Sequence, residues 1–158
     1  MRKILTLTTS AICLFAATTS YALSATQTVK KEVTRVLENG QTVTEQVDAT
    51  LVTPGEKVIY MFDIYNDETE AVNDLVLAMP VPKEIQFIEG SADREGSSVT
   101  YSVDDGKSFH ERDDLNVREN SGLNRAATTD DITHVRWNIS GPIAVGEGDQ
   151  VLFKGRLR

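Results

Sequence analysis

Hydrophobic and polar residues alternate along most of this chain with a period of two, and no long segment repeats its apolar positions every 3.6 residues. Such alternation is typical of strands that bury one face. Turn-forming residues separate the alternating runs, as at Asn39-Gly40 and Pro54-Gly55. The pattern predicts eight or nine short strands and no helix, at about residues 28–37, 42–51, 57–65, 75–79, 85–88, 99–103, 108–110, 132–139 and 150–157.

Two of these segments carry more detail. Asn39-Gly40 lies between two alternating runs, and both residue types tolerate positive φ, so we expect a two-residue type I′ hairpin over about 28–51. The strand at 57–65 is apolar on both faces. One face carries Val58, Tyr60, Phe62 and Ile64, and the other carries Ile59 and Met61. We therefore expect this strand to be covered on both sides.

Regular turn spacing in 158 residues indicates a single all-β domain, an immunoglobulin-like antiparallel β-sandwich. Trp137 is the only tryptophan and is predicted to fill the core. The last strand, ending in Lys154, Arg156 and Arg158, is predicted to be an exposed edge that these charges guard against pairing.

The N-terminus has the features of a secretory signal peptide over residues 1–22. Arg2 and Lys3 precede an uncharged apolar stretch at 4–17, and small residues lead to cleavage after Ala22, with Ser24 or Ala25 as alternatives. The alternative is a membrane anchor, but a spanning helix needs roughly 20 apolar residues. We expect a domain at 23–158, without an integral membrane segment, in the periplasm or secreted.

Cysteine content and charge narrow the function. The only cysteine, Cys13, lies in the predicted signal, so disulfides, thiol catalysis and cysteine zinc sites are not expected in the mature chain. Without Arg2 and Lys3 the chain has 14 basic and 24 acidic residues, a net charge of −10. This charge argues against nucleic acid or anionic membranes as partners.

The segment YSVDDGKSF at 101–109 raises the question of a chemical site. An aspartate can accept hydrogen bonds from backbone N–H groups two residues on, and glycine supplies positive φ. Serines on both sides can tie the arms of a hairpin, and the phenylalanine can pack beneath it. The motif resembles the Asp-box of sialidases, which implies a structural turn. We interpret it as a turn built from Ser102, Asp104, Gly106, Ser108 and Phe109.

The connection at 111–131 is long enough to be functional or disordered. We favour a small extra hairpin around 115–117 with a turn at Asn120-Ser121-Gly122. Calcium would need six to eight converging oxygens, and His110 and His134 lack the spacing of a zinc pair. We interpret the acidic residues here as solvated loop charge: Asp104, Asp105, Glu111, Asp113, Asp114, Asp130 and Asp131.

Catalytic motifs are not found in the sequence: there is no Gly-x-Ser-x-Gly, no His-Glu-x-x-His and no phosphate-binding glycine loop. Glu84 with Glu89, or Asp63 with Asp67, could form a carboxylate pair, but such pairs act only at a defined separation in a cleft. We therefore expect no enzyme activity, no cofactor and no metal.

Three stretches carry a resemblance to a known family. They are TPGEKVIY at 53–60, MPVPKEIQFIEGS at 79–91, and ITHVRW at 132–137 running on to VGEG at 145–148. Their order and spacing over about 48–158 resemble the bacterial conserved repeat domain family, domain of unknown function eleven. This chain has one copy, and Asn66-Asp67-Glu68-Thr69 stands where the family usually has Asn-x-Gly-Thr. The resemblance implies an immunoglobulin-like domain of the cell envelope or surface, without assigned site residues.

These observations favour a noncatalytic exported protein, a structural or protein-interaction module that binds another envelope or surface protein by an edge strand or a sheet face. A carbohydrate- or calcium-binding module is the alternative, with Tyr65 and Tyr101 as the aromatic candidates for a sugar platform. A hydrolase ranks last. Converging carboxylates at 111–131 would favour a metal site or an enzyme.

Overall fold

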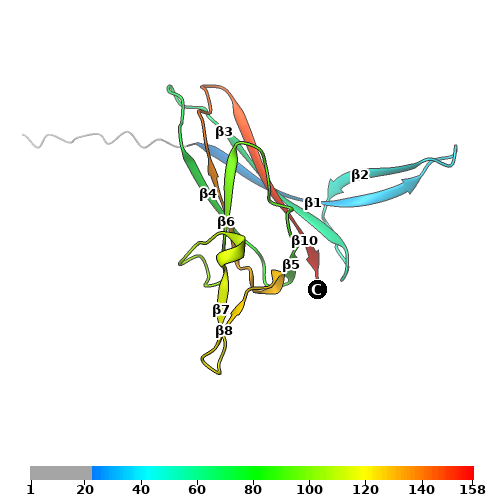
Figure 1. Ribbon diagram of the computed structural model, residues 1–158. Helices are drawn as coiled ribbons and strands as arrows, with labels where there is room; N and C mark the ends of the chain where they lie inside the picture. Colours follow the sequence, from blue (N-terminus) through cyan, green and yellow to red (C-terminus); the bar gives the residue numbers. More distant parts are fainter. Residues whose placement is uncertain (1–22) are drawn as a thin grey trace, which may run out of the picture.

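The computed structural model describes residues 23–158, so the predicted signal peptide and its cleavage at Ala22 lie outside the described residues. The fold is an antiparallel β-sandwich of immunoglobulin-like type, as the sequence predicted (Figure 1). Its larger sheet has five strands in the order β2-β1-β3-β10-β5. Their bounds are β1 Ser24–Val36, β2 Thr42–Asp48, β3 Lys57–Tyr65, β5 Ile85–Phe87 and β10 Gly148–Leu157.

The smaller sheet has three strands in the order β4-β9-β6, and a separate two-stranded ribbon pairs β7 with β8. The predicted extra hairpin within 111–131 is this ribbon, and two short 3₁₀ helices flank it. The bounds are β4 Leu75–Pro80, β6 Ser97–Ser102, β9 His134–Ile139, β7 Asn116–Arg118, β8 Asn124–Ala126, η1 Arg112–Asp114 and η2 Thr129–Asp131.

The core lies between the two sheets and follows the period-two pattern of the strands. Trp137 is fully buried on β9, and its indole Nε1 donates a hydrogen bond to the Ala92 carbonyl at 2.8 Å. Within the larger sheet, Phe153 on β10 stacks on its direct partner Tyr60 of β3, with ring centroids 4.9 Å apart. The prediction that Trp137 fills the core is confirmed. Its indole bond also holds the loop between β5 and β6 against the sandwich.

Both faces of β3 are covered near its start, as expected. Val58 is buried in the core, while Ile59 on the outer face is also fully buried. An ion pair between Lys154 and Glu32, with 3.0 Å between Nζ and Oε1, joins β10 to β1 on either side of β3. Because Lys154 is the direct partner of Ile59 in the β3–β10 ladder, the aliphatic part of its side chain can shield this outer position.

Three details of the strand predictions are wrong. The loop between β1 and β2 has three residues closed by Leu37 and Gln41, and Gly40 has φ +80°, while Asn39 does not have positive φ. This is the geometry of a type I turn with a glycine bulge rather than type I′. Residues 108–110 form no strand, because only His110 bridges to Tyr101. Strand β10 is not an exposed edge, because β3 flanks it on one side and β5 on the other.

Candidate functional site: a cleft along the edge of β6

The turn at 101–109 is organised around Asp104. Its carboxylate accepts hydrogen bonds from the backbone N–H groups of Lys107 and Ser108, three and four residues on rather than two. The hydroxyls of Ser102 and Ser108 also donate to it, each at 2.7 Å. Ser102 Oγ in turn accepts from the Gly106 N–H, and Gly106 has φ +79°. Four donors therefore satisfy one carboxylate within a single loop.

The turn lies on the outer face of the smaller sheet. A Cβ at Gly106 would meet the His134 ring at 3.3 Å, so only glycine fits without displacing that ring. Phe109 packs against the same strand, with the Arg136 guanidinium carbon 4.3 Å from its ring centroid. These contacts fasten the loop to β9, and the five residues predicted for the turn all take part in it.

Acidification is expected to weaken this turn. The hydrogen bonds from Ser108, and then Ser102, hold the pKa of Asp104 well below its ordinary value of 3.8. A carboxyl with a lowered pKa in the folded chain contributes stability above its unfolded pKa, and loses it as pH falls toward the folded value. We expect the urea concentration at the unfolding midpoint to decrease once the pH drops below about 4. Asp104→Asn should lower this midpoint at pH 7 and make it depend less on acid.

Urea unfolding followed by Trp137 fluorescence at a series of pH values measures this effect. Asp105→Asn is the matched control, because the Asp105 side chain accepts no hydrogen bond from the turn. An acid dependence that is equally steep in Asp104→Asn and wild type would contradict the prediction. Asp131, whose pKa Arg125 also lowers, contributes the acid dependence that remains.

Three of the six acidic residues of 111–131 pair with arginines. Asp131 accepts two hydrogen bonds from the Arg125 guanidinium, at 2.6 and 2.8 Å, and Asp130 pairs with Arg158 at 3.0 Å. Within residues 23–158 no group of three or more His, Cys, Asp or Glu side chains is placed to hold a metal ion. The region is therefore ordered, but its carboxylates do not converge.

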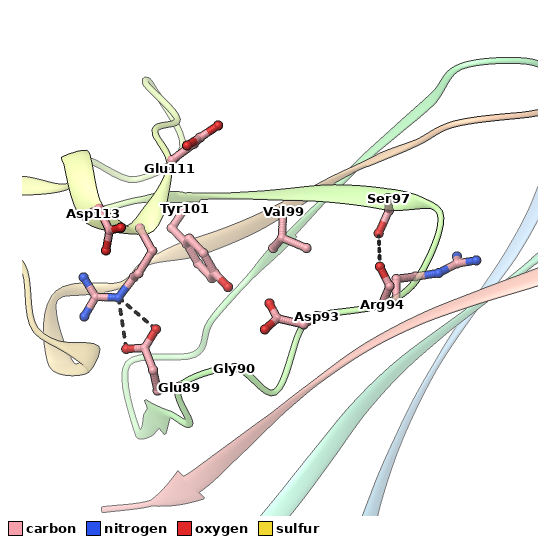
Figure 2. A pocket seen from close by; sticks show the side chains of 10 residues that line it. Glu89, Gly90, Asp93, Arg94, Ser97, Val99, Tyr101, Glu111 and Asp113 are labelled. Carbon is pink, nitrogen blue, oxygen red and sulfur yellow. Dashed lines mark hydrogen bonds and ion pairs between the residues drawn. The ribbon is translucent and has the colours of Figure 1, made fainter.

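A cleft of about 490 Å³ opens where the loop between β5 and β6 runs beside β6 (Figure 2). One wall is β6, the floor is the loop that Trp137 holds in place, and the segment around η1 closes one end. We call this the β6 cleft. Its lining residues are Glu89, Gly90, Asp93, Arg94, Ser97, Val99, Tyr101, Glu111, Arg112 and Asp113.

Tyr101 is the most buried side chain of the β6 cleft, with 4% of its surface exposed. Its ring packs edge-on against Phe87, with centroids 5.5 Å apart. Figure 2 shows its hydroxyl pointing into the cleft, and no hydrogen bond within residues 23–158 engages it. Since those residues contain no buried side-chain N or O atom without a partner, the hydroxyl is accessible from the cleft. Burial, followed by the charges of Asp93 and Glu89, raises the pKa of Tyr101 to about 12, so the hydroxyl stays protonated and neutral.

The charge of the β6 cleft is negative. Four carboxylates and two guanidinium groups line it. Arg112 binds both carboxylate oxygens of Glu89 through Nε at 3.0 Å, and Arg94 turns away to pair with Asp149 at 2.8 Å. No ion pair within residues 23–158 engages Asp93, Glu111 or Asp113. The cleft therefore presents three carboxylates that no arginine or lysine of the described chain neutralises.

The outer edge of β6 beside the cleft carries unpaired backbone groups. Tyr101 exchanges both backbone hydrogen bonds with His110 across this edge, at 2.8 and 3.0 Å. The N–H and C=O groups of successive residues point to opposite sides of a strand. Ser97 and Val99 therefore direct these groups to the same side as Tyr101, away from β9. No strand of residues 23–158 pairs with this stretch, which we call the β6 edge.

The β6 edge lacks the usual guards against pairing. Charged side chains, prolines and short length protect edge strands in most proteins. Strand β2 carries Glu45 and Asp48, β4 ends at Pro80, and β5 has only three residues. Strand β6 reads SSVTYS and has neither a charge nor a proline.

The other residues that the sequence singled out lie elsewhere. Tyr101 is buried and cannot form a flat sugar platform with Tyr65, which is 48% exposed, so this part of the carbohydrate hypothesis is wrong. Of the proposed carboxylate pairs, Glu89 is held by Arg112, and Asp63 accepts a hydrogen bond from Gln150. Sequence reasoning missed Asp93 and the β6 edge, although the uncharged run SSVTYS was a visible signal.

Comparison with known proteins found no matching family model, no matching curated protein and no matching solved structure. Among residues 23–158, no helix has both the length and the apolar character to cross a membrane.

Proposed function

We propose that this protein is a noncatalytic, exported envelope protein that binds another protein by adding a strand to its smaller sheet. The observation that supports the proposal is the β6 edge, an unguarded strand whose outward backbone groups at Ser97 and Val99 have no partner in the described chain. An extended segment of a partner can bind such an edge through main-chain hydrogen bonds. The signal-like N-terminus and the resemblance to the conserved repeat domain family support export to the envelope.

Strand addition has a geometric basis here. The neighbouring position, Tyr101, already exchanges two hydrogen bonds with His110 across the same edge. A partner strand would extend this pairing toward Ser97, over the stretch where the chain itself turns away at η1. Side chains of the added strand would alternate between solvent and the β6 cleft. The backbone provides affinity, and the cleft provides selectivity.

Site-specific crosslinking in the exporting cell tests this proposal. A photoreactive residue at exposed Ser98 is expected to capture one partner, and the same residue at Gln46 on β2 is not. Val99→Pro removes an N–H that faces away from β9, so it should abolish capture while leaving the β6–β9 ladder intact. Val99→Thr, which keeps the N–H, is the matched control and should retain capture.

Recovery of the monomer alone from both crosslinking positions would overturn the proposal. So would capture that is equally strong in wild type and Val99→Pro, because the partner would then bind elsewhere. Thermal unfolding of both Val99 variants shows whether each is folded in the assay.

A further inference from the structure

We infer that the β6 cleft receives the ammonium group of a lysine side chain, carried by the partner segment that pairs with the β6 edge. This inference rests on the proposed function and names the chemistry of the partner. It would explain why a strand edge without charges lies directly beside a cleft with unneutralised carboxylates.

The Tyr101 hydroxyl is the first reason. The Tyr101 side chain is 96% buried, but its hydroxyl points into the cleft and forms no hydrogen bond within residues 23–158. Because those residues contain no buried side-chain N or O atom without a partner, the hydroxyl is open to a ligand in the cleft. A ligand with N–H donors could donate a hydrogen bond to this hydroxyl, since a neutral phenol can accept one.

Charge is the second reason. Among the charged groups near Tyr101, the Asp93 carboxylate has the strongest effect on its hydroxyl. Figure 2 shows the two groups facing the same space. The Asp93 carboxylate forms no ion pair in the described chain, whereas Glu89 is already bound by Arg112. A positive ligand beside Asp93 would therefore neutralise one of the three carboxylates that no arginine or lysine of the described chain pairs with.

The arrangement of acceptors favours ammonium over guanidinium. A guanidinium binds best when two of its N–H groups meet both oxygens of one carboxylate, whereas an ammonium is a compact point charge. The Tyr101 hydroxyl and the Asp93 carboxylate are separate acceptors, one on β6 and the other on the loop that forms the floor of the cleft. A compact ammonium has three donors to divide between two such groups.

Strand pairing sets the position of the lysine. Residues that face each other across two antiparallel strands project to the same side of the sheet. Val99 and Tyr101 project into the cleft. A partner residue opposite Val99 therefore projects into the cleft too, and its aliphatic stem would run along Val99 while its ammonium reaches Asp93.

Peptide titration followed by backbone amide NMR tests the inference on the mature protein. The probe is a capped heptapeptide, Thr-Val-Thr-Lys-Thr-Val-Thr, compared with the same peptide carrying norleucine at the centre. We expect the lysine peptide to shift the Ser97, Val99 and Asp93 amide signals and to bind at least tenfold more tightly. Asp93→Asn and Tyr101→Phe should each remove most of this difference.

Matched controls separate the cleft from general charge and folding effects. Glu95→Gln removes one carboxylate from the same loop outside the cleft, and Tyr65→Phe removes an exposed phenol. Both should retain the tenfold preference for lysine. The Trp137 indole N–H signal reports whether the loop is still held by Ala92 in every variant.

The outcomes separate this inference from the proposed function. Equal binding of the lysine and norleucine peptides, with shifts at Ser97 and Val99, would overturn the ammonium site and leave strand addition standing. Binding of 1,5-diaminopentane with no binding of either peptide would show that the cleft binds small amines. It would overturn the inference that a lysine of a partner segment enters the cleft. Failure of strand addition itself is detected independently, by crosslinking with Val99→Pro.

Discussion

Asn66→Asp is expected to lower the free energy of unfolding by about 4 kcal/mol at pH 7. Asn66 is fully buried. Its Nδ2 donates to the carbonyls of Glu70 and Ile143, at 2.9 and 2.8 Å, and its Oδ1 accepts from the Glu68 N–H. Aspartate keeps the acceptor but replaces the double donor with a charged oxygen that faces two carbonyl oxygens.

The loss in free energy of unfolding caused by Asn66→Asp should become smaller on acidification. Burial and the facing carbonyls favour the neutral acid, so the pKa of the new carboxyl is raised in the folded chain. A raised pKa contributes stability below the unfolded pKa, and this contribution is lost as pH rises through the folded value. The stability difference from wild type should therefore be smaller at about pH 4 than at pH 8.

Urea denaturation at both pH values measures the effect, and Asn73→Asp is the matched control. Asn73 is exposed in the same connection, so the same chemical change there should alter stability by less than about 0.5 kcal/mol. An Asn66→Asp variant as stable as Asn73→Asp would show that the three side-chain hydrogen bonds do not organise this end of the sandwich.

Gly155→Ala is expected to destabilise the protein by about 3 kcal/mol through overpacking. A Cβ at Gly155 would lie 2.1 Å from Ile85 Cγ2 and 3.2 Å from the Gln86 carbonyl oxygen. The glycine does not have positive φ, so the effect comes from the close approach of β5 to β10 and not from backbone conformation.

A double-mutant cycle identifies the colliding atoms. Leucine has no Cγ2, so Ile85→Leu should recover part of the loss when combined with Gly155→Ala, while Ile85→Leu alone costs less than about 1.5 kcal/mol. Equilibrium unfolding of the four variants measures the coupling. Strictly additive effects would place the strain elsewhere in β10.

The sandwich and the cleft depend on the same buried anchor. Trp137 fills the core and binds the Ala92 carbonyl, which holds the loop that carries Asp93 beside β6. The position of the candidate site is therefore set by core packing and not by the flexibility of a loop. This arrangement suits a binding module, because a pre-positioned cleft loses little conformational entropy when a partner binds.

Local patterns in the sequence determined the fold class and most strand positions. Strand β3 was predictable from an apolar run with turn residues at both ends. Strands β9 and β10 were predictable from the alternation around Trp137 and Phe153. The turn around Asp104 was also predictable, because its hydrogen bonds join residues at most four positions apart. In each case, the physical signal lies within a few neighbouring residues.

Only the tertiary structure decided which strand edges are covered and which side chains meet. The charges at the end of β10 indicated an exposed edge, yet β5 pairs with Gly155 and its neighbours there. Asp93 and Tyr101 come together because the loop carrying Asp93 packs under Trp137, while the unguarded edge of β6 results from sheet order. These features depend on contacts between distant segments, and neither periodicity nor turn chemistry encodes such contacts.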